Sequence, residues 1–404
     1  MSETYIINGQ VYVGRRFQRK TIFVSAGKIR LMDPDIQVSG DVIDISGRKV
    51  VPGFIDIHTH GAVGVDVNGA DVDGLEKIGA FFAKHGTTSW LASILTDTEE
   101  QTCRAISQCL SYQKSLRMGA QLLGIHLEGP FLASQFKGAM PEHLLKKGSL
   151  ALLTSYQDKA EGNVRYITVS PEVEGVLEMI PALKELGITV AIGHSGADYD
   201  TAMAAIRAGA AACTHTFNAM ALLHQHRPAI LGAALESDIY CEMICDGLHL
   251  HPGIVRLLWK TKGGGRLVAI TDSIMAAGLP DGYYHLGVNQ VVVENGDAKL
   301  VSDGTRAGST LTQDRALRNI LAFTGLPLED VLPVLTENPA KLIGVYDRKG
   351  SIEDGKDADL VVLDVHAQIT EGVLRGRRLV LNTCLGGKAK LFKKWGGLDA
   401  AHSN

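Results

Sequence analysis

Eight apolar runs of strand length, separated by amphipathic helical segments, occupy the middle of this 404-residue chain. Helical periodicity follows most of the runs. Strands that alternate with helices form a parallel sheet, and eight strands are the number that closes a (β/α)8 barrel. Periodicity alone does not separate such a barrel from an open, doubly wound sheet. The runs are residues 54–58, 89–95, 122–128, 165–169, 189–194, 212–216, 241–245 and 267–271.

Residues of metal-ligand type stand at the ends of five of these runs. Neighbouring side chains on a strand alternate between its faces, so two histidines separated by one residue can bind one ion. A closed barrel gathers the carboxyl ends of all its strands around one point, which an open sheet cannot do for strands 1, 3, 5, 6 and 8. The ligand placement therefore predicts an α/β fold with a TIM-like (β/α)8 barrel. The residues are His58 and His60, Glu128, His194, His215 and Asp272.

Glu128, His194 and His215 together match a catalytic zinc set, in which three protein ligands leave one position open for water. Zinc lowers the pKa of such a water to ~7 and so supplies hydroxide at neutral pH. Asp272 then serves as the general base, which takes a proton from the water and returns it to the leaving group.

Each of these residues also has a purely structural interpretation. Glu128 can be a solvated carboxylate at a strand end, the histidines can be hydrogen-bonded core residues, and Asp272 can cap a helix. His126, on the same strand face as Glu128, can orient a ligand or simply be a satisfied barrel-core histidine. The coincidence of five strand ends favours the metal site.

Short strands separated by turns occupy both ends of the chain. Each end is too small to bury a core by itself. We therefore expect a small discontinuous β-sandwich domain from residues 1–50 and 349–392, with the barrel over residues 51–348. The expected strands are residues 5–13, 21–24, 28–31 and 42–45, and residues 359–363, 369–373 and 378–381.

Composition and missing motifs exclude several other classes of protein. The net charge of −4 gives no electrostatic footprint for nucleic acid. The chain has no run of eighteen apolar residues and no signal-peptide pattern, so we expect no membrane partner. The six cysteines contain no Cys-x-x-Cys pair and indicate free thiols in the cytoplasm. Neither a nucleophile elbow nor a phosphate-binding Gly-rich motif is present.

A series of motifs gives the chain a resemblance to the amidohydrolase superfamily, and within it to the N-acetylglucosamine-6-phosphate deacetylase family. The motifs follow the family order and span nearly the whole chain. They are His-Leu-Glu-Gly-Pro-Phe (126–131), Lys-Gly-Ala (137–139), Gly-His-Ser (193–195), Thr-His-Thr-Phe-Asn-Ala-Met (214–220), Asp-Gly-Leu-His (246–249), Thr-Asp-Ser (271–273), Ala-Gly-Ser (307–309) and the tail segments 337–344 and 350–364.

The resemblance implies removal of the acetyl group from an N-acetylhexosamine 6-phosphate, giving an amino sugar phosphate and acetate. It implies one or two divalent ions, with zinc preferred and Fe, Mn or Co as alternatives, and with Glu128 bridging when a second ion is held by His58 and His60. It also implies a homodimer that lends a phosphate-reading loop to its neighbour. Substrate contacts are expected from Ala139, Met140, Asn218, Ala219, His226, Arg227, His249, Ala307, Gly308 and Ser309.

Two departures from the family pattern leave the substrate open. Met140 stands where the family has His, and His226-Arg227-Pro228 replaces the usual Arg-acid-Pro order. Arg227 can still bind phosphate, because a guanidinium matches phosphate oxygens, or it can be a solvated loop charge. The alternatives are a deacetylase of another or unphosphorylated N-acyl amino sugar, a hydrolase of N-acyl amino acids or cyclic imides, and a non-enzymatic sugar-binding regulator.

Overall fold

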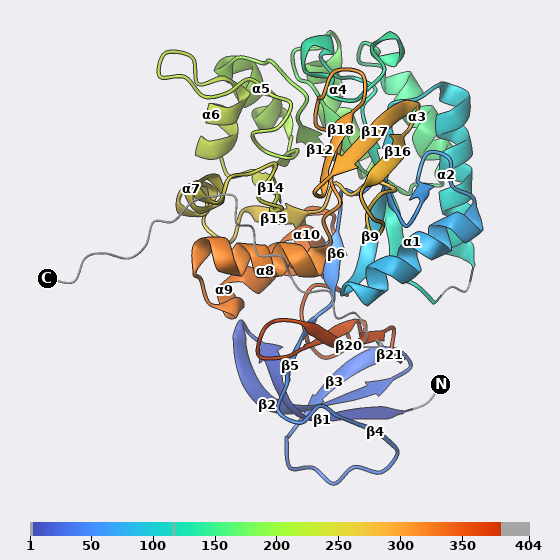
Figure 1. Cartoon of the computed structure of the whole chain (residues 1–404), viewed down its shortest axis with the longest axis vertical. Helices are drawn as coiled ribbons and strands as arrows, with labels where there is room; N and C mark the ends of the chain where they lie inside the picture. Colours follow the sequence, from blue (N-terminus) through green and yellow to red (C-terminus); the bar gives the residue numbers. More distant parts are fainter. Residues whose placement is uncertain (1–2, 116–117, 381–404) are drawn as a thin grey trace, which may run out of the picture.

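A computed structural model describes residues 3–115 and 118–380 (Figure 1). Its centre is an eight-stranded parallel sheet whose strands follow one another in chain order. All eight predicted runs form strands of this sheet. They are β6 (Phe54–Asp56), β9 (Thr87–Leu95), β10 (Gln121–Glu128), β11 (Val164–Val169), β12 (Thr189–Ile192), β13 (Ala212–Cys213), β14 (Tyr240–Ile244) and β15 (Leu267–Ile270).

Contacts between the first and the last strand close this sheet into a barrel. The Asp272 amide donates to the His58 carbonyl over 2.9 Å, and the His60 amide donates to the Ser273 carbonyl over 2.7 Å. The Thr271 hydroxyl also donates to the buried Asp56 carboxylate over 2.6 Å. The predicted barrel fold is confirmed, and the carboxyl ends of strands 1 and 8 lie side by side.

Helices cover the outside of the barrel (Figure 1). Side chains of β9 show the layering: Leu91 lies in the inner cluster, whereas Trp90 and Ile94 belong to the outer cluster under the helices. Asp71, Thr98, Ser149 and Asp198 each accept a backbone N–H as helix N-caps, which fixes where those helices start. The helices are α1 (Val72–Lys84), α2 (Glu99–Lys114), α3 (Leu150–Lys159), α4 (Val176–Glu185), α5 (Tyr199–Ala208), α6 (Ala229–Glu236), α7 (Pro252–Lys262), α8 (Gln313–Thr324), α9 (Leu328–Leu335) and α10 (Glu337–Leu342), with short 3-10 turns at Ser134–Phe136 and Glu142–Leu144.

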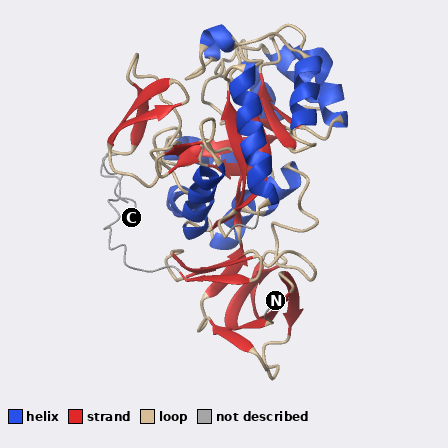
Figure 2. Cartoon of the chain, turned by 90° about the vertical axis from the view of Figure 1, so that its right-hand side faces the viewer, coloured by secondary structure: helices blue, strands red, loops and turns tan. Residues whose placement is uncertain are grey.

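The two ends of the chain form one sheet below the barrel, seen again from the side in Figure 2. Its N-terminal and C-terminal parts join where β5 pairs antiparallel with β19. The Ile29 amide donates to the Lys356 carbonyl, so the sheet curls back on itself around its own apolar core. The strands are β1 (Thr4–Val13), β2 (Arg16–Ser25), β3 (Lys28–Met32), β4 (Asp41–Asp44), β5 (Lys49–Pro52), β19 (Leu360–Leu363), β20 (Ile369–Leu374) and β21 (Arg377–Val380).

The predicted boundaries at residues 50/51 and 348/349 stay a prediction. Strand β5 crosses the first of them, because it lies in the small sheet and runs directly into β6. Residues 381–392 of the predicted small domain, including the end of its last predicted strand, lie outside the described residues. In the described part of the chain, no helix is both long and apolar enough to cross a membrane.

A three-stranded antiparallel sheet, which was not predicted from the sequence, lies between β15 and α8 in chain order. It consists of β16 (Gly282–Leu286), β17 (Asn289–Glu294) and β18 (Asp297–Leu300). Its inner side packs on Leu95 and Ile274, at the carboxyl ends of barrel strands, and on Met140 in the loop after β10. A two-stranded hairpin, β7 (Gly61–Ala62) with β8 (Val65–Asp66), follows β6. Both additions lie at the carboxyl end of the barrel.

Asp314, in the first turn of α8, ties this helix to the end of α1. Its carboxylate lies 3.0 Å from His85 Nδ1 and 2.9 Å from Arg318 Nη2, and it accepts the Thr312 hydroxyl over 2.6 Å. Burial raises the pKa of Asp314, but the hydrogen bond to His85 and the charge of Arg318 outweigh it and hold this pKa well below its ordinary value.

We expect Asp314→Asn to lower the free energy of unfolding at about pH 7 by roughly 1–3 kcal/mol. A folded-state pKa below the unfolded value stabilises above the unfolded pKa, and this stabilisation is lost as the pH falls towards the folded pKa. Urea unfolding at about pH 7 and about pH 3 should therefore show a difference between parent and variant that shrinks in acid. The exposed Asp347→Asn is the control, and an equal effect of both substitutions would contradict the assignment.

Candidate active site

Six polar residues at the carboxyl ends of the barrel strands face one another. Glu128 ends β10, whereas the others follow their strands within a few residues. His194, His215 and Asp272 have φ values of 46°, 25° and 50°, so the chain turns out of each strand through the left-handed region. Non-glycine residues in this region cost free energy and concentrate at functional sites. The others of the six are His58 and His60.

The Glu128 carboxylate stands at the centre of the group. Its Oε1 lies 3.1 Å from His194 Nε2, 3.3 Å from His215 Nε2 and 3.3 Å from His58 Nε2. Its Oε2 lies 3.3 Å from His60 Nε2. One carboxylate thus joins two sets of candidate ligands, Glu128 with His194 and His215, and His58 with His60 and Asp272.

All four histidines point the same nitrogen, Nε2, toward the centre. For three of them Nδ1 lies near a backbone carbonyl: His60 near Ser93 (3.1 Å), His194 near Phe136 (2.8 Å) and His215 near Asn218 (3.2 Å). A carbonyl only accepts hydrogen bonds, so Nδ1 carries the proton and Nε2 presents its lone pair.

These lone pairs approach each other closely. The Nε2 atoms of His194 and His215 are 3.0 Å apart, and those of His58 and His60 are 3.2 Å apart. Two lone pairs at this distance repel unless a cation or a proton lies between them. A carboxylate and several neutral imidazoles are also a donor set that zinc and similar divalent ions bind. The residues therefore fit a divalent metal.

Protons compete with a cation for these atoms. Burial lowers the pKa of His60, but hydrogen bonds with Asp272 and Glu128 outweigh it and raise this pKa to about 9. Burial raises the pKa of Glu128, but the charge of His58 and its hydrogen bonds to the histidines hold it well below its ordinary value. Metal binding at such a site must release protons.

Glu242 is a functional residue that the sequence analysis missed. Its fully buried carboxylate lies 3.2 Å from His58 Nδ1 and accepts the His215 amide over 3.1 Å and the Tyr166 hydroxyl over 2.6 Å. It thereby orients two candidate ligands, as acidic partners of metal-bound histidines do. An acidic residue in the middle of the buried strand β14 was the signal that could have revealed it.

His126 is a satisfied core residue, the second of its two interpretations. Its Nδ1 lies 2.8 Å from the Ser93 hydroxyl and its Nε2 lies 3.0 Å from the Thr168 hydroxyl. Burial and the nearby charge of His58 lower the pKa of His126 well below its ordinary value. A neutral imidazole with both nitrogens occupied has no lone pair left for a metal.

Several predicted substrate residues lie next to the candidate ligands. Asn218 and Ala219 form the turn after His215, and the Ala219 carbonyl accepts the Ser195 amide over 3.2 Å. The Ser309 amide donates to the Asp272 carbonyl over 2.7 Å. At Gly308, with φ of 62°, an added Cβ would lie 2.9 Å from the Asp272 carbonyl oxygen. The segment of Ala307, Gly308 and Ser309 thus fixes the backbone of Asp272.

The other predicted substrate residues lie farther along their loops. The His249 Nδ1 lies 2.6 Å from an Asp246 carboxylate oxygen. The Ala139 carbonyl accepts the Asn289 side-chain amide over 2.7 Å. Met140 is buried under the three-stranded sheet, where it packs with apolar side chains. Their contacts with a substrate stay a prediction.

His226 and Arg227 lie on an exposed turn before α6. The Arg227 amide donates to the His224 carbonyl over 2.9 Å, and both His226 and Arg227 are exposed. The Arg227 side chain makes no hydrogen bond or ion pair with any residue of 3–115 or 118–380. The fold thus brings the six candidate metal and base residues together, while these two side chains stand at the surface.

A (β/α)8 barrel with a histidine- and carboxylate-lined centre at its strand ends defines the class of metal-dependent barrel hydrolases. The chain belongs to the amidohydrolase family, whose model matches residues 49–394.

Two relatives in this family are named as deacetylases of amino sugar phosphates. The N-acetylglucosamine-6-phosphate deacetylase of Bacillus subtilis (strain 168) is 38% identical over 87% of this chain and 91% of that protein. The N-acetylgalactosamine-6-phosphate deacetylase of Escherichia coli O157:H7 is 34% identical over 88% of this chain and 93% of that protein.

A solved structure from Mycobacterium smegmatis has the same fold. It is a mutant N-acetyl-D-glucosamine-6-phosphate deacetylase in complex with N-acetyl-D-glucosamine-6-phosphate. It matches with a TM-score of 0.88 and 32% identity over 94% of this chain and 100% of that chain.

We expect His194→Ala to lose most of the bound metal and activity, because it removes one of three lone pairs around Glu128 Oε1. Elemental analysis after dialysis, with circular dichroism to check folding, measures the effect. The exposed His143→Ala should keep its full metal content. A folded His194→Ala protein with unchanged metal would contradict the ligand assignment.

Proposed function

We propose that this enzyme hydrolyses the acetamide group of an N-acetylhexosamine 6-phosphate, with N-acetylglucosamine 6-phosphate as the first candidate. The products are acetate and the amino sugar 6-phosphate. The observation that carries the proposal is the group of six polar residues around Glu128 in an amidohydrolase whose relatives are named as deacetylases of such sugars.

We assign Glu128, His194 and His215 as the ligands of one divalent ion, and His58 and His60, with Glu128 between the two sets, as candidates for a second. Zinc suits this mixture of imidazole and carboxylate, and Fe, Mn and Co are alternatives. A metal bound there supplies a water of lowered pKa and polarises the acyl oxygen.

Asp272 is the proposed general base and acid. Burial raises its pKa, but the charge of His58 and the hydrogen bond with His60 outweigh it and hold this pKa below its ordinary value, so the group is an ionised carboxylate, the form that a general base requires. The proton of the attacking water passes to Asp272 as the new C–O bond forms. The same proton then goes to the amide nitrogen as the C–N bond breaks, which leaves a neutral amine and acetic acid. The acetic acid then ionises to acetate, and the amine or the solvent takes up its proton.

Recognition of the sugar phosphate is assigned to the loops around this centre. The proposed contacts come from Ala139, Met140, Asn218, Ala219, His226, Arg227, His249, Ala307, Gly308 and Ser309. The polar side chains among these residues, such as those of Asn218 and His249, suit hydroxyl groups, and the exposed guanidinium of Arg227 suits a phosphate group.

Arg227 stands on an exposed turn, beside Leu222 and Leu223, which are 61% and 55% exposed. A second copy of the chain would cover this turn, and we therefore propose a homodimer in which the turn meets the neighbour's site. We also propose a cytoplasmic location, since the five described cysteines are free thiols and four of them are buried.

A galactose epimer is the second candidate substrate. The relative from Escherichia coli O157:H7 is named for N-acetylgalactosamine 6-phosphate and is 34% identical to this chain. The two sugars differ only at one hydroxyl, and a single hydroxyl can decide specificity where the site hydrogen-bonds it.

We expect Asp272→Asn to lower kcat by roughly 10²–10⁴ while it keeps the fold, because an amide cannot accept the proton of water. Acetate release and thermal unfolding, measured side by side, separate the two effects. The exposed Asp347→Asn serves as the control. A fast Asp272→Asn enzyme would place the base on another residue.

We expect kcat/KM for the 6-phosphate sugar to exceed that for unphosphorylated N-acetylglucosamine by orders of magnitude. The unphosphorylated sugar would leave the donors of the phosphate site without a partner, which is costly. Arg227→Ala should raise KM chiefly for the phosphorylated sugar. The assay compares N-acetylglucosamine and N-acetylgalactosamine, each with and without the phosphate. Equal rates with and without phosphate would instead indicate a deacetylase of an unphosphorylated N-acyl amino sugar.

A further inference from the structure

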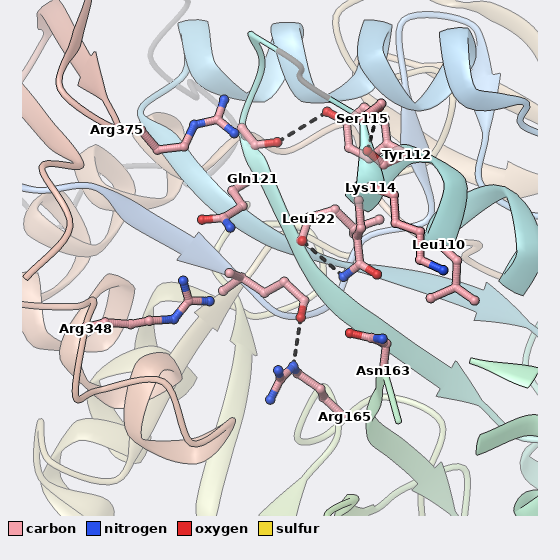
Figure 3. Close-up of a pocket in the computed structure, with 13 residues that line it drawn as sticks. Leu110, Tyr112, Lys114, Ser115, Gln121, Leu122, Asn163, Arg165, Arg348 and Arg375 are labelled. Atoms are coloured by element: carbon pink, nitrogen blue, oxygen red, sulfur yellow. Dashed lines mark hydrogen bonds between the residues drawn. The ribbon is translucent and has the colours of Figure 1, made fainter. Parts of the chain in front are cut away.

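A polar cavity lies at the opposite end of the barrel from the six candidate active-site residues (Figure 3). Its volume is about 270 Å³, close to the lower end of the ~300–1,000 Å³ typical of small-molecule pockets. The wall combines the end of α2, the start of β10 and the residues just before and at the start of β11. Arg348, from the segment between α10 and β19, and Arg375, from the turn between β20 and β21, complete it.

The cavity is lined by positive charge. Among the described residues that line it, four are cationic, namely Lys114, Arg165, Arg348 and Arg375, and none is acidic. The guanidinium groups come from three separate segments and extend toward the same space in Figure 3. The polar side chain of Gln121 stands between Arg375 and Arg348 in Figure 3, and Asn163 lies beside Arg165.

Groups just outside the cavity wall, two carboxylates and one backbone carbonyl, interact with three of these cations. Lys114 Nζ lies 2.7 Å from Glu161, and Arg348 Nη1 lies 3.4 Å from Asp357. Arg375 Nη2 donates to the Gly119 carbonyl over 3.2 Å. Each of these three cations therefore has a partner at the edge of the cavity.

Arg165 differs from Lys114 and Arg348, which each face an acidic side chain. Its Nε donates to the Leu123 carbonyl over 2.7 Å, and within residues 3–115 and 118–380 no carboxylate forms an ion pair with it. Burial and the neighbouring charge of Arg348 lower the pKa of Arg165. A half-buried guanidinium that faces a second one is unfavourable unless an anion lies between them.

We propose that this cavity is a binding site for a phosphate group, carried by inorganic phosphate or by a small phosphate monoester. Guanidinium groups match phosphate oxygens in a bidentate manner, and three of them from different directions suit a tetrahedral anion better than a planar carboxylate. The hydrogen-bonding side chains of Gln121 and Asn163 suit the hydroxyl groups of a monoester. The bound group would join the barrel to the small sheet.

The test is a titration of the metal-loaded enzyme with inorganic phosphate and with glycerol 3-phosphate at constant ionic strength, followed by calorimetry and by Tm. Arg348→Gln removes one guanidinium without touching the inside of the barrel. Arg165→Gln is the second variant, and it needs a folding check because the Arg165 stem packs on Gly124. Arg104→Gln, on the exposed face of α2, is the matched control.

We expect the anion to raise the Tm of the parent and of Arg104→Gln, and to bind roughly 10- to 100-fold more weakly to Arg348→Gln and Arg165→Gln. Binding of either probe in this pattern supports the site, and the tighter of the two shows whether a free or an esterified phosphate is preferred.

Because the proposed catalytic end also binds phosphate, Arg227→Ala is titrated in parallel. Unchanged binding in Arg348→Gln and Arg165→Gln, with loss in Arg227→Ala, would assign all phosphate binding to the catalytic end and overturn the proposal. Equal Tm rises in every protein would overturn it as well.

Discussion

The site depends on the closure of the barrel between its first and last strands. Backbone hydrogen bonds join His58 to Asp272 and His60 to Ser273, and the Thr271 hydroxyl donates to the buried Asp56 carboxylate. Burial raises the pKa of Asp56 to about 6, although hydrogen bonds from Thr271 lower it. Without this closure the histidines after β6 and the aspartate after β15 would stand at opposite edges of an open sheet. Closure is thus what converts six separate strand-end residues into one centre.

A second layer of hydrogen bonds fixes the direction of each imidazole. Carbonyls of Ser93, Phe136 and Asn218 and the carboxylate of Glu242 each face one Nδ1. Most of these acceptors are backbone atoms, so the orientation does not depend on which side chains surround the site. Lone pairs held inward by fixed backbone are costly for an empty site and favourable for a cation, which is how a rigid barrel obtains metal affinity.

The sequence predicted the barrel well because its strands obey one simple rule. Strands buried on both faces appear as continuous apolar runs, and polar residues at their ends interrupt those runs visibly. His58, Glu128 and Asp272 were therefore found from position alone. Glu242 escaped because it lies inside an apolar strand rather than at its end, and only the fold shows that it faces His58 and His215.

The three-stranded sheet of β16, β17 and β18 was not predicted for a different reason. Its strands alternate buried and exposed residues, with Val291 and Val293 inside and Tyr283 78% exposed, so each gives only a weak pattern. It gains stability by packing on the end of the barrel, a long-range contact that local sequence does not contain. The same limit applies to the basic cavity. Two of its arginines, Arg165 and Arg348, are more than 180 residues apart in the sequence.

The carboxyl end of the barrel combines rigid strand ends with an exposed turn. At the carboxyl end, the candidate metal ligands follow rigid strands, whereas the proposed phosphate contacts His226 and Arg227 stand on an exposed turn. A change in that turn alters no hydrogen bond of the imidazoles, so the departures from the family pattern at residues 226–227 can alter substrate preference while the hydrolytic centre stays intact. In (β/α)8 enzymes, residues at the strand ends generally carry the chemistry and the loops carry the specificity. For this reason the sequence predicts the reaction class more firmly than it predicts the sugar.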